Sequence, residues 1–117
     1  MHQDIEPLYY NEIGISFFWK KVKTGDTAKV QLVFRDTGLL LSAQELNVFS
    51  ENVRALMRSK SLCTDCQNKE GCRSLLLETH LTTLSFAISP SELGQLRDLL
   101  EGTLFQLQLN ACLDDLL

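Results

Sequence analysis

Three cysteines lie close together in the segment CTDCQNKEGC, which begins at Cys63. Cys63 and Cys66 form a Cys-x-x-Cys pair, a spacing that lets two thiolates bind one zinc ion from a single tight turn. Cys72 follows a short polar run and could fold back as a third ligand. A tetrahedral zinc site needs a fourth ligand, for which the chain offers Cys112 or His80. One interpretation of the segment is therefore a structural zinc site.

The same cysteines fit two other interpretations. In a reducing compartment cysteines are thiols or metal ligands rather than disulfides, so Cys63, Cys66 and Cys72 could be reduced thiols in a polar loop. Cys112 would then be a small apolar residue of the core. Redox chemistry is the third interpretation, because nearby cations stabilise a thiolate. The flanking cations are Arg58, Lys60, Lys69 and Arg73. We expect no cofactor other than zinc.

Residue patterns of the common enzyme classes are missing from the sequence. The chain lacks a Ser-His-Asp triad order, a glycine-rich loop for phosphate and a His-Glu-x-x-His zinc motif. His80 follows Thr79 between two apolar segments, which is typical of a strand end or a turn rather than of a catalytic base. Residues 17–21 mix aromatic and basic side chains, as in single-stranded nucleic-acid sites, but they also alternate as a strand does. We therefore expect a non-enzymatic protein.

Length and charge indicate a single domain that spans residues 1–117. A chain of 117 residues buries roughly two thirds of its unfolded surface around one core. Hydrophobic residues make up 44% and charged residues 22%, which argues against a disordered chain. The formal net charge of -4 gives no general attraction to nucleic acid or to an anionic membrane. No secretory signal pattern and no run of about 20 apolar residues is present, so we expect a cytoplasmic protein without membrane or nucleic-acid partners.

Alternating apolar residues predict strands in the first third of the chain. The predicted strands are residues 13–22, 30–35 and 39–41. We place the turn before the last strand at Asp36-Thr37-Gly38, because glycine accepts a positive φ. Ser42 and Glu45 then form a Ser-x-x-Glu capping box, in which each side chain pairs with a backbone amide of the other residue. This box predicts a helix that ends near Ser59.

A second set of elements follows the cysteine segment. Residues 75–78 and 82–88 are predicted strands, and Ser89 opens a second capping box with Pro90 at the first helical position. The helix is expected to reach about Glu101, with Gly102 as its terminator. Residues 103–110 alternate like a strand, but they are rich in Leu and Gln, which favours a second helical piece kinked off the first.

The two helix starts align at a constant offset of 47 residues, Leu39–Leu46 with Phe86–Leu93. One explanation is a duplicated strand-to-helix unit. The other is that any strand that leads into a capped amphipathic helix produces this pattern.

This twofold pattern resembles an uncharacterised family of short bacterial proteins, a domain of unknown function. The matching segments are Leu32–Phe49, which includes Asp36-Thr37-Gly38 and Leu39-Leu40-Leu41-Ser42, and Leu77–Leu100, which includes Ser89-Pro90-Ser91-Glu92-Leu93. The resemblance implies a fold class and no activity. Family members often carry a Cys-x-x-Cys pair near the first strands, where this chain has residues 17–21 without cysteine.

Together these patterns predict an α+β fold: an antiparallel sheet of about five strands with two or three helices on one face, and two similar halves if the unit is duplicated. The function we expect is a small module that binds a protein partner or forms a homodimer. Dimer contacts are expected from the exposed leucines near the carboxyl end, Leu113, Leu116 and Leu117. A structural zinc-binding protein is the alternative.

Overall fold

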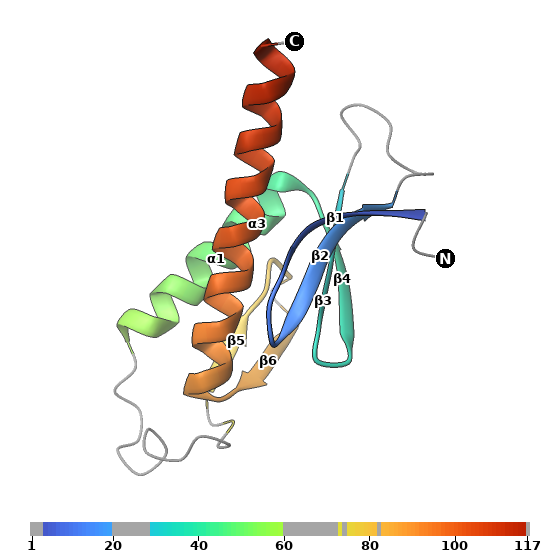
Figure 1. The fold of residues 1–117 in the computed structure, drawn as a ribbon. Helices are drawn as coiled ribbons and strands as arrows, with labels where there is room; N and C mark the ends of the chain where they lie inside the picture. The colour runs from blue at the N-terminus through green and yellow to red at the C-terminus, as the bar shows by residue number, and fades with distance from the viewer. Residues whose placement is uncertain (1–3, 20–28, 60–72, 74, 82, 117) are drawn as a thin grey trace.

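The computed structural model describes residues 4–19, 29–59, 73, 75–81 and 83–116, with side chains as far as residue 113. Strands and helices follow one another in the order β1-β2-β3-β4-α1-β5-β6-α3 (Figure 1). Their bounds are β1 Ile5–Tyr10, β2 Gly14–Trp19, β3 Val30–Phe34, β4 Thr37–Leu41, α1 Ala43–Arg58, β5 Leu75–Glu78, β6 Ser85–Ile88 and α3 Pro90–Leu116. The predicted α+β class is confirmed.

The strands form two antiparallel sheets rather than the single expected sheet. One sheet has the order β1-β2-β3-β4, and β5 pairs with β6 in a separate hairpin. Strand β1 was not predicted from the sequence. It pairs with β2, and the register of this pairing shifts between Pro7 and Tyr9. The predicted strand over residues 13–22 is confirmed for Gly14–Trp19. Its last three residues lie outside the described part.

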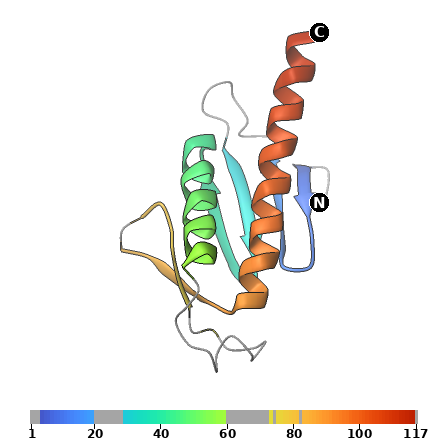
Figure 2. The same cartoon turned by 90° about the vertical axis from the view of Figure 1, so that its left-hand side faces the viewer.

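Both helices cover the same face of the four-stranded sheet (Figure 2). Helix α1 contacts β4 and the β5–β6 hairpin, whereas α3 contacts β1 and β2. The predicted placement of helices on one face is therefore confirmed. Within the described residues, neither helix combines the length and apolar character that a membrane-spanning segment requires.

The turn between β3 and β4 lies one residue earlier than predicted. Phe34 pairs with Thr37, so Arg35 and Asp36 form the turn and Gly38 belongs to β4. Arg35 has a φ of 55°, which is uncommon for a residue other than glycine. Its side chain donates a hydrogen bond to the Ala87 carbonyl oxygen at 2.8 Å. Arg35 thus combines a positive φ, which a local sequence pattern would assign to glycine, with a side-chain hydrogen bond to a residue far away in the sequence.

Helix α3 continues through Gly102, so the predicted end and kink at this residue are wrong. The helical assignment of residues 103–110 is confirmed. Gly102 contacts the ring of Tyr9, whose hydroxyl hydrogen-bonds to the Asp98 carboxylate at 3.1 Å. Glycine is therefore needed here for the close approach of β1 to the helix, and not as a terminator. Beyond this contact α3 extends past the sheet, as Figures 1 and 2 show.

One apolar core joins the two halves of the chain. Phe34 of β3 lies 5.0 Å from Phe86 of β6, measured between ring centroids, and both rings approach Phe49 of α1 at 6.4 Å. The first hairpin-helix unit, β3-β4-α1, and the second, β5-β6-α3, therefore share a core. The other members of this core cluster are Val30, Leu32, Leu41, Leu46, Val53, Leu75, Leu77, Ile88, Leu93, Leu96, Leu99 and Leu100.

Two glycines of α3 should respond oppositely to alanine. Gly94→Ala is expected to raise the free energy of unfolding by about 0.5–1 kcal/mol, because alanine restricts the unfolded chain and no atom lies within 4 Å of the added Cβ. Gly102→Ala is expected to lower it by about 1–3 kcal/mol, because the Cβ would lie 2.6 Å from ring atoms of Tyr9. Urea unfolding of the two variants tests this. Equal stabilisation by both substitutions would contradict the close packing of Tyr9.

Candidate functional site

Of the residues proposed as zinc ligands, His80 and Cys112 lie in the described part of the chain. Cys63, Cys66 and Cys72 fall outside the described residues. Cys112 is exposed on the projecting part of α3, so its interpretation as a buried apolar residue is wrong. Among the residues that the structure describes, no group of three His, Cys, Asp or Glu side chains is placed to hold a metal. The zinc site, with Cys112 or His80 as fourth ligand, stays a prediction.

His80 lies against the start of α1. Its Nε2 is 3.8 Å from a carboxylate oxygen of Glu45, and its buried Nδ1 has no hydrogen-bond partner among the described residues. Glu45 accepts a hydrogen bond from the Ser42 amide at 2.9 Å, and this bond is the main cause that lowers the pKa of Glu45. Since the carboxylate is already engaged in the capping box, we assign this pair a structural role and no catalytic one.

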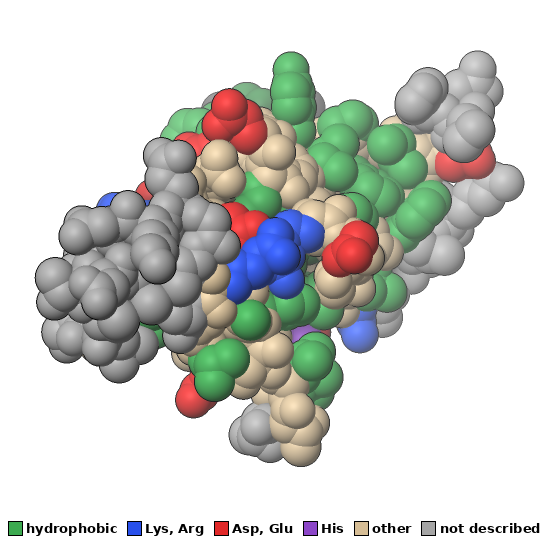
Figure 3. Space-filling model, turned by 90° about the horizontal axis from the view of Figure 1, so that it is seen from below, with side chains coloured by type: hydrophobic (Ala, Val, Ile, Leu, Met, Phe, Trp, Pro, Cys, Tyr) green, Lys and Arg blue, Asp and Glu red, His purple; other side chains and the backbone are tan. Residues whose placement is uncertain are grey.

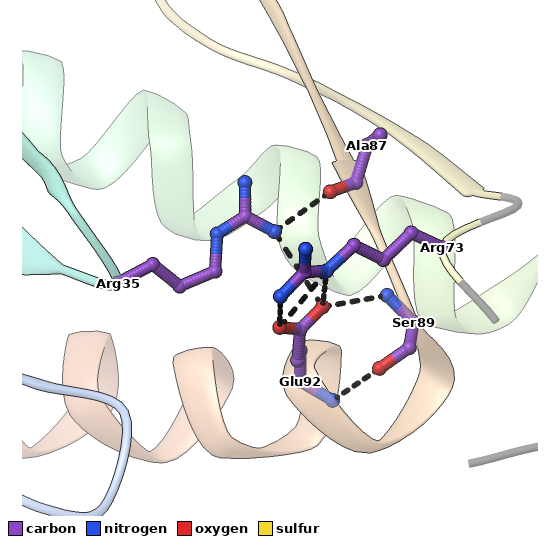
Figure 4. A network of polar contacts seen from close by, with 5 residues as sticks. All are labelled: Arg35, Arg73, Ala87, Ser89 and Glu92. Carbon is purple, nitrogen blue, oxygen red and sulfur yellow. Dashed lines mark hydrogen bonds and ion pairs between the residues drawn. The ribbon is translucent and has the colours of Figure 1, made fainter. Parts of the chain in front are cut away.

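Glu92, at the start of α3, is the centre of a denser polar network (Figure 4). Arg73 donates to its two carboxylate oxygens at 3.0 and 2.8 Å, and the Ser89 amide donates to it at 3.1 Å. Arg35 lies 3.5 Å away on the other side. The hydrogen bond from Arg73 is the main cause that lowers the pKa of Glu92 to about 2. Figure 3 views this end of the molecule, where basic side chains gather beside acidic ones.

The two capping boxes are linked reciprocally across the halves of the chain. Glu45 of the first unit faces His80, which follows β5 of the second. Glu92 of the second unit faces Arg35, in the β3–β4 turn of the first. Each helix start therefore contacts a cationic or ionisable side chain from the other unit. This arrangement gives the four side chains structural roles at the helix starts.

Open hollows lie between α1 and α3 on the solvent side. One, of about 260 Å³, is lined by Arg54, Met57, Arg58 and Arg97. Glu101 already pairs with Arg97 at 3.0 Å and with Arg54 at 3.6 Å. Among the described residues that line it, none is a nucleophile or a general base, and two of the three guanidinium groups are partly neutralised.

The four-stranded sheet has a second face that neither helix covers. Strand alternation and register define it: Val30, Leu32 and Phe34 of β3 point into the core, so Gln31 and Val33 point the other way. Cross-strand partners share a face in an antiparallel sheet. The outer face accordingly consists of Ile5, Pro7, Tyr10, Ile15, Phe17, Trp19, Gln31, Val33, Gly38 and Leu40.

None of these outward positions carries a charged side chain. Tyr10, Leu40 and Trp19 are 74%, 49% and 39% exposed. Trp19 packs edge-on against Phe17 with ring centroids 5.1 Å apart, and its Nε1 donates to Gln31 at 3.0 Å. Antiparallel sheets with one solvated face normally alternate apolar and polar residues. Here both faces are apolar, which is the pattern of a sheet that is covered on both sides.

Sequence reasoning missed this surface although its signal was present. The alternation of Ile15, Phe17 and Trp19 predicts a strand with one buried apolar face. The outward residues Ile15, Phe17 and Trp19 form one apolar set. Ser16, on the opposite face, is buried and hydrogen-bonds to Thr103 of α3 at 2.6 Å. The inner face of β2 is thus the more polar one.

Comparison of the chain with protein-family models, with curated proteins and with solved structures finds no match. The resemblance to a family of unknown function therefore stays a prediction.

The ion pair of Glu92 should make stability depend on pH. Its pKa is about 2 in the folded chain, against an ordinary 4.5, so its stabilisation is complete above the ordinary value and is lost as the pH falls toward 2. Arg73 is half exposed, and solvent screening limits the effect to about 1–2 kcal/mol. We expect Glu92→Gln to lower the free energy of unfolding by this amount near neutral pH, and by much less at about pH 3.

Urea titrations of the wild type and the Glu92→Gln variant measure the difference. The matched control is Glu101→Gln, whose exposed ion pairs with Arg54 and Arg97 should contribute less than about 0.5 kcal/mol. A Glu92→Gln difference that stays constant with pH would contradict the assigned network.

Proposed function

We propose that this chain is a small non-enzymatic binding module, and that the outer face of its four-stranded sheet is the binding surface. The observation that carries the proposal is the absence of charge from the outward positions of the described strands β1 to β4. Contiguous exposed apolar patches on soluble domains mark interaction sites. The cytoplasmic location expected from the sequence remains part of this proposal.

The residue types of the outer face support a role in binding a partner rather than in stabilising the core of the chain. Tyr, Trp and Phe are enriched in the centres of protein interfaces, where charged residues are depleted. Tyr10 and Leu40 are too exposed to contribute much to the core of the chain itself. Charged residues of this part of the molecule lie at strand ends instead: Glu12, Lys29 and Asp36 are all exposed. An apolar centre with a polar border is the usual anatomy of an interface.

The other candidate functional sites of the described chain give weaker support for a function. His80, Glu45 and the Glu92 network have structural partners, as described above. The hollow near Arg58 has no nucleophile or general base among its described lining residues. The leucines near the carboxyl end stay a predicted contact, and Leu113 is 48% exposed on α3. Phe105 and Leu109 share its side of the helix by their spacing, but they form a narrow stripe rather than a broad face.

An apolar dye tests whether the outer face binds apolar groups. Trp19 is the only tryptophan of the chain and lies in this face, so energy transfer from it reports a dye bound nearby. We expect anilinonaphthalene sulfonate to bind the folded chain in dilute solution and to quench Trp19. Leu40→Glu should weaken this binding several-fold, because it puts a charge into the apolar face.

The matched control is Leu76→Glu, which changes a more exposed leucine, at 67%, on the separate β5–β6 hairpin. It should leave the quenching unchanged. Thermal unfolding verifies that both variants are folded. Absence of dye binding to the folded wild type, or equal losses in both variants, would contradict the proposed surface.

A further inference from the structure

We propose that the outer sheet face binds the same face of a second copy of this chain, so that two four-stranded sheets pack face to face in a two-fold symmetric dimer. This inference rests on the proposed binding function and names its partner. It concerns the face formed by Ile5, Pro7, Tyr10, Ile15, Phe17, Trp19, Gln31, Val33, Gly38 and Leu40.

Charge is the first argument for a second copy. In a two-fold interface the same surface patch occurs on both subunits, and a group near the axis meets its own symmetry mate. A charge near the axis would therefore face a like charge. A face that carries no charge at all avoids this repulsion in any register of the two copies. A different partner would impose no such requirement and would usually be selected by complementary charges.

Shape is the second argument. Sheets pack on sheets at about 10 Å with their strands roughly 30° apart, because both surfaces share the same twist. A second copy supplies a sheet of identical width and twist. The exposed side chains vary in size across the face, from Gly38 through Leu40 to Tyr10 and Trp19. Large side chains of one sheet can thus fill the space above small residues of the other, as in a β-sandwich core.

The polar groups of the face are compatible with burial. Trp19 Nε1 already donates to the Gln31 amide oxygen at 3.0 Å, so the indole donor has its partner within the face. Tyr10 is the last residue of β1 and is 74% exposed. The apolar centre can therefore be covered without burying an unpaired charge. The exposed charges of Glu12, Lys29 and Asp36 remain at strand ends.

Sedimentation equilibrium over a wide range of protein concentration tests the dimer. We expect a reversible monomer–dimer equilibrium and a blue shift of Trp19 emission on association. Leu40→Glu should raise the dissociation constant by at least about 100-fold, because each dimer buries the new charge twice. Tyr10→Ser, at a residue that is 74% exposed, is a second variant that leaves the fold intact and should also weaken the dimer.

Two controls locate the interface. Leu113→Glu changes a leucine of nearly the same exposure as Leu40, 48% against 49%, on the far end of α3. Leu76→Glu changes an exposed strand residue of the separate hairpin. Both variants should retain the wild-type dissociation constant.

The outcomes separate this inference from the function on which it rests. If the chain stays monomeric at every concentration but its outer face binds the dye, the dimer proposal is wrong and the proposed binding surface is supported. A dimer that Leu113→Glu dissociates, while Leu40→Glu and Tyr10→Ser do not, would overturn the sheet-to-sheet arrangement. Loss of dye binding and of self-association together would remove both proposals.

Discussion

The fold depends on one constraint: two helices can cover only one face of the four-stranded sheet. The rings of Phe34, Phe49 and Phe86 meet between that face, α1 and the β5–β6 hairpin, and they join both hairpin-helix units into one core. Because the covered face takes up both helices, the opposite face of the sheet has no cover from the described part of the chain. Its apolar composition then becomes the main functional observation.

Polar interactions hold the two helices in place, and they involve the ionisable side chains at both helix starts. Each helix begins with a capping box whose glutamate also faces a side chain from the other half, His80 in one case and Arg35 in the other. On the sheet side, Ser16 and Thr103 form a buried pair, and Tyr9 reaches Asp98 of α3. These contacts position the halves relative to each other. They also engage the carboxylates of Glu45 and Glu92 at the two helix starts.

Local patterns in the sequence predicted those elements whose boundaries are encoded by neighbouring residues. Both capping boxes, the helix of α1 and the alternation in β2, β3 and β6 belong to this class. Strand β1 was missed because Pro7 interrupts its pattern, although proline is acceptable in an edge strand. Gly102 was misread as a helix end because its reason, contact with Tyr9, lies far away in the sequence. The turn at Arg35 was misplaced for the same kind of reason. Of the proposed zinc ligands, His80 and Cys112 lie in the described part of the chain. The full set of residues on the outer face follows only from the strand register, which shows which residues share that face.

The central claim is that the uncovered sheet face is the contact surface between two copies. An isotope-filtered NMR experiment on a mixture of labelled and unlabelled chains tests it most directly, because it detects protons that approach one another only across an interface. The account predicts intermolecular signals among Tyr10, Ile15, Trp19 and Leu40. Their absence at concentrations at which the chain is dimeric, or signals that connect only Phe105, Leu109 and Leu113 of α3, would contradict it.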